Sequence, residues 1–239
     1  CLVVGAVLGW VMAGWALALW VLPGVLRFWV GGAGGAREET REHVPSLLDA
    51  LKRPEIRRGL AASAIYVLAQ KAALAMLGPF LIDAGLDLSM VGLVNGVGSM
   101  FVGLAAALAG GALVKWFGPR NVLVLALVLQ AGSLFFFSVF DLSGGFSTTA
   151  LMVVAVLSSS GFMALGFVAL YAQFMRWSDP RQAGVDFTLF QCMDALVSMA
   201  GGIAAGYAAQ YFGYGAFFAG AGLVALLAAP AIVVVSDRR

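Results

Sequence analysis

The sequence predicts an all-α membrane protein with seven transmembrane helices, and three observations support this fold class. Hydrophobic residues make up 62% of the 239 residues and charged residues only 11%, whereas a soluble domain carries about 25% charged residues. Apolar runs of about 20 residues, the length needed to cross a bilayer as a helix, recur along the chain. The basic residues are confined almost entirely to alternate connections between these runs.

Taken in order, the apolar runs define three parts of the chain. The first run, 2–22, predicts a transmembrane helix that extends to about residue 30, and the polar stretch 31–59 predicts a linker with a short surface helix at 45–51. Six further runs predict a six-helix transmembrane bundle over 60–239. Their expected bounds are 61–82, 90–113, 121–140, 149–174, 184–209 and 216–235.

The lysine and arginine residues predict the orientation of the chain. Counted from the connection after the first run, they number seven, none, two, none, two, none and two. Connections rich in Lys and Arg lie on the cytoplasmic side. We therefore expect the linker and the C-terminus to be cytoplasmic and the N-terminal end to lie outside.

Lys71 is the first candidate for a functional residue because it lies in the middle of the 61–82 run. A cation at this depth is costly unless it faces a partner or a water-filled cavity, and ionisable groups inside membrane helices usually mark a solute or ion pathway. Asp194 is the one carboxylate deep inside a predicted helix. We expect Lys71 either to bind an anionic group of a solute or to pair with Asp194.

Other polar side chains inside the predicted helices are weaker candidates. Thr188, Gln191, Asp194 and Ser198 recur at helical spacing, which predicts a polar face on the 184–209 helix. Such a face lines a cavity or forms a hydrogen-bonded seam with a neighbouring helix. The other candidates for the pathway are Gln70, Tyr66, Asn95 and Tyr171, although single amides and phenols often only join helices.

Charged residues at the cytoplasmic helix ends are candidates for a gate. We expect Asp186 at the mouth of the 184–209 helix, near Arg181 or Lys115, as a gate or a helix-start carboxylate. Arg120 completes this set. Halfway along the 149–174 run, the Ser-Ser-Ser-Gly sequence at 158–161 predicts a local polar patch, of a kind that can accompany a binding site.

The sequence gives no indication of an enzyme, because no metal-ligand spacing, nucleophile motif or phosphate-binding loop occurs. We therefore expect no metal and no cofactor, and no nucleic-acid partner either, because the basic residues are scattered among short connections. The expected partners are the lipid bilayer and a small-molecule solute. The chain begins inside an apolar run without Met, so we also expect a preceding part of the same protein.

One connection resembles the signature loop of the major facilitator superfamily, which reads glycine-x-leucine-x-aspartate-arginine-x-glycine-arginine. Gly111, Leu113 and Gly118 fit this pattern, and Arg120 lies one residue beyond its last arginine position. Lys115 and Trp116 occupy the aspartate and first arginine positions. That departure removes the basis for a gating salt bridge in this loop. The resemblance implies that 1–30 is the last helix of an N-terminal half and that 60–239 is the C-terminal half.

A narrower similarity concerns most of 60–215. The stretches 66–71, 77–81 and 92–96 look like the branch that contains muropeptide permeases and acetyl-coenzyme A transporters, and 183–191 and 201–206 look closer to its siderophore permeases. This resemblance implies import of a siderophore across the bacterial inner membrane by alternating access, driven by the proton motive force. A permease for muropeptides or other amphipathic anions is the alternative. A seven-helix receptor or retinal protein is more distant, because 216–235 lacks a lysine for a Schiff base.

Overall fold

The computed structural model describes residues 47–93, 96, 98–179 and 182–237. The predicted helix at 1–30 and most of the predicted linker lie outside the described residues, so the count of seven transmembrane helices stays a prediction. Helices make up the architecture, and no strand occurs among the described residues. Four helical stretches are long and apolar enough to cross a membrane: Pro54–Asp83, Ser99–Leu142, Thr148–Trp177 and Ala183–Val234.

The first stretch is preceded by the short helix α2 (Leu47–Lys52), in agreement with the predicted surface helix. It then runs through α3 (Pro54–Val67), a π-helical turn η1 (Leu68–Ala72) and α4 (Leu77–Asp83). The predicted single helix at 61–82 therefore starts earlier, at Pro54, and is interrupted between η1 and α4. Pro79 explains the interruption, because it cannot donate a backbone hydrogen bond to Ala75 and its ring crowds that carbonyl.

The second stretch is α6 (Ser99–Leu142), which follows the short helix α5 (Leu88–Leu93) and contains a sharp turn. Gly118 has φ 81° and ψ 156° there and is followed by Pro119, a combination that ends one helical arm and starts another. A straight helix of 44 residues would be about 66 Å long, roughly twice the hydrocarbon thickness of a bilayer. Gly118 thus separates two arms, between the helices predicted at 90–113 and 121–140.

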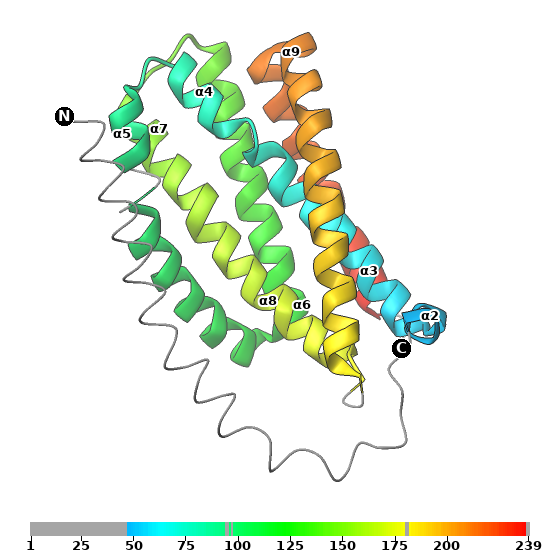
Figure 1. The fold of residues 1–239 in the computed structure, drawn as a ribbon. Helices are drawn as coiled ribbons and strands as arrows, with labels where there is room; N and C mark the ends of the chain where they lie inside the picture. The colour runs from blue at the N-terminus through cyan, green and yellow to red at the C-terminus, as the bar shows by residue number, and fades with distance from the viewer. Residues whose placement is uncertain (1–46, 94–95, 97, 180–181, 238–239) are drawn as a thin grey trace, which may run out of the picture. The chain divides into compact units, whose positions relative to one another are not determined.

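The remaining helices form two further stretches. Helix α7 (Thr148–Val156), a second π-helical segment η3 (Leu157–Phe162) and α8 (Met163–Trp177) form one continuous stretch. Helix α9 (Ala183–Asp237) is divided at Gly213, where φ is 78° and ψ is 165°. Figure 1 shows α9 turning back there, so that its second arm runs antiparallel to its first. The segment η3 coincides with the predicted polar patch.

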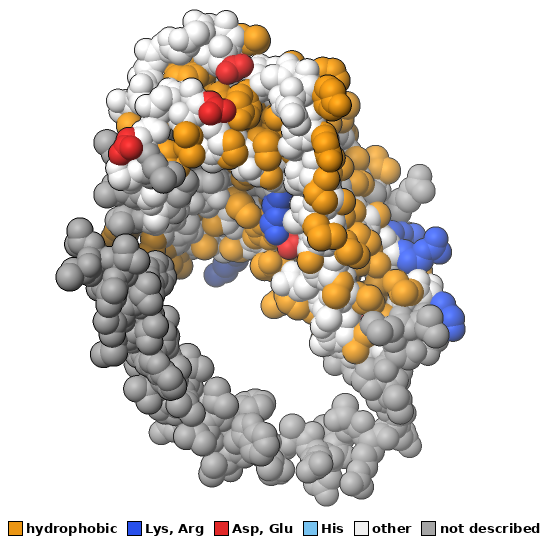
Figure 2. Space-filling view, turned by 45° about the horizontal axis from the view of Figure 1, so that its top comes forward, with side chains coloured by type: hydrophobic (Ala, Val, Ile, Leu, Met, Phe, Trp, Pro, Cys, Tyr) orange, Lys and Arg blue, Asp and Glu red, His pale blue; other side chains and the backbone are white. Residues whose placement is uncertain are grey.

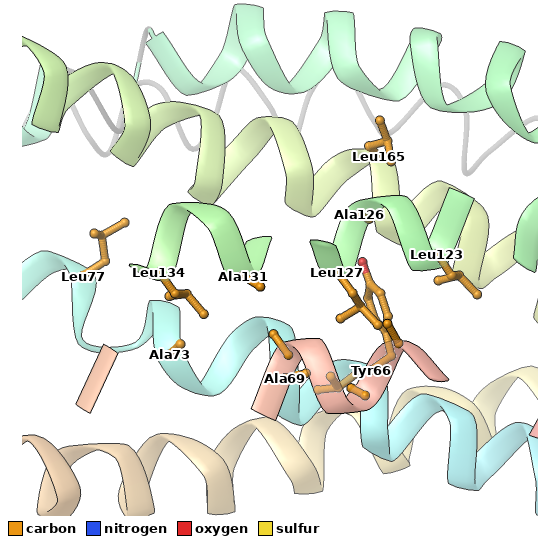
Figure 3. Close-up of a cluster of buried hydrophobic side chains, with 14 of the residues drawn as sticks. Tyr66, Ala69, Ala73, Leu77, Leu123, Ala126, Leu127, Ala131, Leu134 and Leu165 are labelled. Atoms are coloured by element: carbon orange, nitrogen blue, oxygen red, sulfur yellow. The ribbon is translucent and has the colours of Figure 1, made fainter. Parts of the chain in front are cut away.

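The core lies where α3, the second arm of α6 and α8 meet. Figure 3 shows Tyr66, Ala69 and Ala73 of the first stretch facing Leu123, Ala126, Leu127, Ala131 and Leu134 of α6. The many alanines let the helix backbones approach closely, as is typical of helix packing in lipid. At one end, the rings of Phe80, Phe137 and Phe218 pack with centroids 5.0–6.0 Å apart.

Much of the outer surface is apolar as well. Large exposed hydrophobic side chains occur along both arms of α6 and α9, among them Leu108, Met199 and Leu227. Figure 2 shows hydrophobic side chains spread over the coloured part of the visible face, with one Lys or Arg beside an Asp or Glu near its middle. An apolar surface of this extent fits lipid rather than water as the surrounding solvent.

Candidate functional site

An ion pair between Lys71 and Asp194 lies inside the membrane-spanning part of the structure. The Lys71 Nζ atom is 2.8 Å from both carboxylate oxygens of Asp194. The hydroxyl of Ser198, one turn further along α9, donates to Asp194 at 3.4 Å. The Lys71 ammonium also lies 4.8 Å from the ring centroid of Phe167 on α8, within the range of a cation–π contact. Lys71 thus contacts both α8 and α9.

The ion pair is only partly buried. The Lys71 side chain is 25% exposed and the Asp194 side chain 16%, so both charges retain access to a space outside the packed core. A closed pair in a dry core gains little net stability, because desolvation offsets the Coulomb attraction. In a partly exposed pair, Lys71 can instead exchange Asp194 for an anionic solute, and Asp194 can exchange Lys71 for a proton.

The π-helical turn η1 explains how neighbouring residues face opposite environments. Gln70 is completely buried, whereas Lys71, the next residue, faces Asp194. A π turn inserts one extra residue into a helix and often occurs at functional sites. In this position it directs the charge of Lys71 to α9 while the amide of Gln70 points into the bundle.

Gln70 belongs to a buried polar cluster with Gln130, Ser133 and Ser158. Gln70 Nε2 donates to Gln130 Oε1 at 3.5 Å, and Gln130 Nε2 donates to Ser158 Oγ at 2.8 Å. Ser133 Oγ lies 3.1 Å from Ser158 Oγ and donates to the Gln130 carbonyl at 2.8 Å. The cluster joins η1 to η3 through α6. The amide of Gln130 is isolated in the apolar 121–140 run, and single amides in such runs often join helices.

The two predicted tyrosines occupy different surroundings. Tyr66 is completely buried, and its hydroxyl has no hydrogen-bond partner among the described residues. That hydroxyl fits against Gly166, where an added Cβ would lie 1.5 Å from its oxygen. Tyr171 is half-buried and packs against Phe167 and Phe187, with ring centroids 5.6 and 5.8 Å away. Tyr66 also contacts Phe167, with ring centroids 6.1 Å apart. Both tyrosines therefore lie beside the ring that Lys71 faces, and they differ in burial, because Tyr66 belongs to the core.

The predicted polar face of α9 is only partly assembled into the site. Asp194 and Ser198 contact each other, whereas Thr188 is exposed and donates to the carbonyl of Gly184 at 2.8 Å on its own helix. Gln191 is exposed. Asn95 lies outside the described residues.

The surroundings predicted for Asp186 need a correction. Asp186 is completely buried in the first turn of α9, and the structure pairs it with Arg53, which precedes α3, rather than with Lys115. Its carboxylate also accepts from the backbone N–H of Asp179 at 2.9 Å. A buried carboxylate needs such a partner, and sequence reasoning did not single out Arg53 among the basic residues of the linker.

The roles of the other gate candidates stay predictions. Lys115 is exposed near the end of the first arm of α6, and Arg120 is half-buried just beyond Pro119. Arg181, the second predicted neighbour of Asp186, lies outside the described residues.

A separate cavity of about 480 Å³ opens at the α4 end of the structure, away from the Lys71 pair. Asp83 and Asp141 line it, but both carboxylates already have structural partners. Asp83 accepts from the Tyr214 hydroxyl at 2.9 Å, and Asp141 accepts from the Gly215 N–H at 2.8 Å. These bonds attach the start of the second α9 arm to α4 and α6.

Kinked apolar helices around an embedded ion pair define a helical multi-pass membrane protein. The family model described as Major Facilitator Superfamily matches residues 59–239. The chain therefore belongs to the major facilitator superfamily, a family of membrane transporters of small-molecule solutes. None of the curated proteins compared with the chain gives a significant match.

Proposed function

We propose that this chain contributes the solute-binding side of a proton-driven importer, with a siderophore as its solute. The observation that carries the proposal is the partly exposed Lys71–Asp194 pair, 2.8 Å long, in the middle of apolar helices. Siderophores carry carboxylate or phenolate groups, which suit an ammonium in a low-dielectric cavity.

The proposed cycle uses the two charges in turn. A proton that binds to Asp194 removes its negative charge and weakens its hold on Lys71. Lys71 is then available for an anionic group of the solute, and Phe167 and Tyr171 supply apolar contact beside it. Loss of the proton on the other side restores the ion pair and displaces the solute. Either occupant keeps the lysine paired, which avoids the cost of an isolated cation at this depth.

The proposed architecture follows from the six helical arms. Residues 60–239 act as the C-terminal half of a two-half transporter in the bacterial inner membrane, with 31–59 as the linker and 1–30 as the last helix of the other half. The linker and the C-terminus are cytoplasmic in this proposal, because the basic connections lie on that side. Cysteine labelling in the linker from outside intact cells is then expected to fail.

Uptake by cells expressing the full-length transporter tests the solute class. Labelled ferric siderophore should accumulate and anhydromuropeptide should not, and a protonophore should abolish the accumulation. Accumulation of the muropeptide alone would favour the alternative function, a permease for amphipathic anions. An embedded lysine suits that function equally well. The receptor alternative is set aside, because the chain belongs to a transporter family.

A further inference from the structure

We propose that Arg53 is a positioning residue for the Lys71–Asp194 site. Its ion pair with Asp186 fixes the register of the first arm of α9 against α3, so that Asp194 stays opposite Lys71. The inference concerns the geometry of the pair, and it draws on the proposed function only for the moment at which Lys71 leaves Asp194.

The first argument is the burial of Asp186. Its side chain is completely inaccessible, and the Arg53 guanidinium, the Asp179 N–H and the Gln182 side-chain amide all donate to it. The second guanidinium nitrogen of Arg53 lies 3.6 Å from the Asp179 carboxylate. A buried acid held by several donors is a rigid attachment, since removal of one partner leaves a charge without compensation.

The second argument is the backbone conformation of Arg53 and the direction of its side chain. Arg53 has an extended backbone (φ −72°, ψ 127°) between α2 and α3, as expected for a residue that precedes a proline. Its side chain is directed inward and is 27% exposed, whereas Arg57, one turn into α3, is exposed. Arg53 thus reaches α9, whereas Arg57 faces outward.

The third argument is that the same two segments carry both ion pairs. Arg53 directly precedes α3, and Lys71 lies in η1, which continues α3. Both acids, Asp186 and Asp194, belong to the first arm of α9. The two acids are eight residues apart, which is about 12 Å along a helix. Two attachments at different heights fix both the position and the rotation of one helix against the other.

The fourth argument is that small residues lie in the apolar contact between these segments. Between the two ion pairs Gly59 packs against Phe190, and beyond them Gly201 packs against Ala72 and Leu68. Small apolar surfaces let membrane helices approach closely, but lipid supplies no hydrophobic force that selects one register. When a solute displaces Asp194 from Lys71, the Arg53–Asp186 pair still attaches α9 to the start of α3.

Pulsed electron paramagnetic resonance on the protein in nanodiscs tests the inference without any solute. Spin labels are attached to Cys192, which is exposed on α9, and to an introduced Ala61→Cys on α3, in a Cys1→Ser background. The wild type, the Arg57→Met control and Lys71→Met alone should each give one narrow distance distribution. Arg53→Met combined with Lys71→Met should lose this narrow peak, and exchange of the charges (Arg53→Asp with Asp186→Arg) should restore it.

An unchanged narrow distribution in Arg53→Met combined with Lys71→Met would overturn the inference, even if the variant melts at a lower temperature. A merely structural residue lowers stability without moving α9 in the folded protein. If Arg53→Met does not fold, Arg53→Lys keeps the charge and loses the second contact. In the Lys71→Met background it should broaden the distribution, and a narrow distribution there would overturn the inference equally. Because no solute is present, these results do not depend on the outcome of the uptake assays.

Discussion

Removal of one partner of the Lys71–Asp194 pair should cost more stability than removal of both. At 2.8 Å and an effective dielectric constant of about 20, the gross attraction is about 6 kcal/mol. Desolvation costs several kcal/mol per ion, so the net contribution of the intact pair is small. A stranded charge keeps the desolvation cost and loses the attraction. For a fully buried pair this penalty is about 3–5 kcal/mol.

The observed exposure lowers that penalty. Because the side chains are 25% and 16% exposed, we expect Lys71→Met and Asp194→Asn each to lower the free energy of unfolding by about 2–3 kcal/mol. The double variant, Lys71→Met with Asp194→Asn, should lose about 1 kcal/mol or less. Asp194→Asn should be the milder single change, since Phe167 still contacts the ammonium.

Unfolding titrations with sodium dodecyl sulfate in mixed micelles measure the three variants on one scale. Gln191→Met, an exposed change on the same helix, serves as the control and should stay within about 0.5 kcal/mol of the wild type. Additive losses, in which the double variant is as unstable as the sum of the two single variants, would refute the reasoning. They would mean that the two charges do not interact in the folded protein.

Three further substitutions test other parts of the structure, two of them by unfolding titrations and one by the level of stable expression. Gln130→Leu strands the Gln70 and Ser158 side chains and should cost about 1–3 kcal/mol, and a loss no larger than that of Gln191→Leu would contradict the buried cluster. Gly166→Ala should abolish stable expression, because its Cβ overlaps the Tyr66 hydroxyl, and Tyr66→Phe should partly restore it; normal expression of Gly166→Ala alone would argue against this packing. Gly118→Ala should lower the free energy of unfolding by about 1–3 kcal/mol, because the backbone at this position has a glycine-only conformation. The control Gly132→Ala, within the helix and with open space around it, should be neutral or slightly stabilising. Equal effects of the two changes would exclude the turn at Gly118.

The positions of the helices were predictable because each depends on its own sequence. Apolar runs of about 20 residues follow from the thickness of the bilayer, and the Gly-Pro pair at 118–119 breaks a helix wherever it occurs. The π-helical turns were not predictable, because they depend on how η1 and η3 pack around Gln130. The predicted 61–82 helix was interrupted by Pro79, whose effect on the preceding turn depends on the neighbouring helices.

The two ion pairs also differ in how far the sequence alone could predict them. Lys71 and Asp194 stand almost alone among apolar residues, so their pairing was one of two expected outcomes. Arg53 is one of many basic residues near the linker, and composition does not distinguish the one that reaches Asp186. That choice is made by the extended backbone before Pro54 and by the approach of α9, which are features of the folded chain.

Transport by the Lys71 and Asp194 variants tests the central claim most directly. Full-length transporter carrying Lys71→Ala, Asp194→Ala or both is reconstituted in proteoliposomes, and counterflow of the labelled solute is measured without a proton gradient. If Lys71 binds the solute, Lys71→Ala and the double variant should both be inactive, although the double variant recovers stability. Asp194→Ala should retain solute exchange and lose gradient-driven accumulation. Wild-type counterflow by Lys71→Ala would contradict the account, because the solute would then bind without the embedded ammonium.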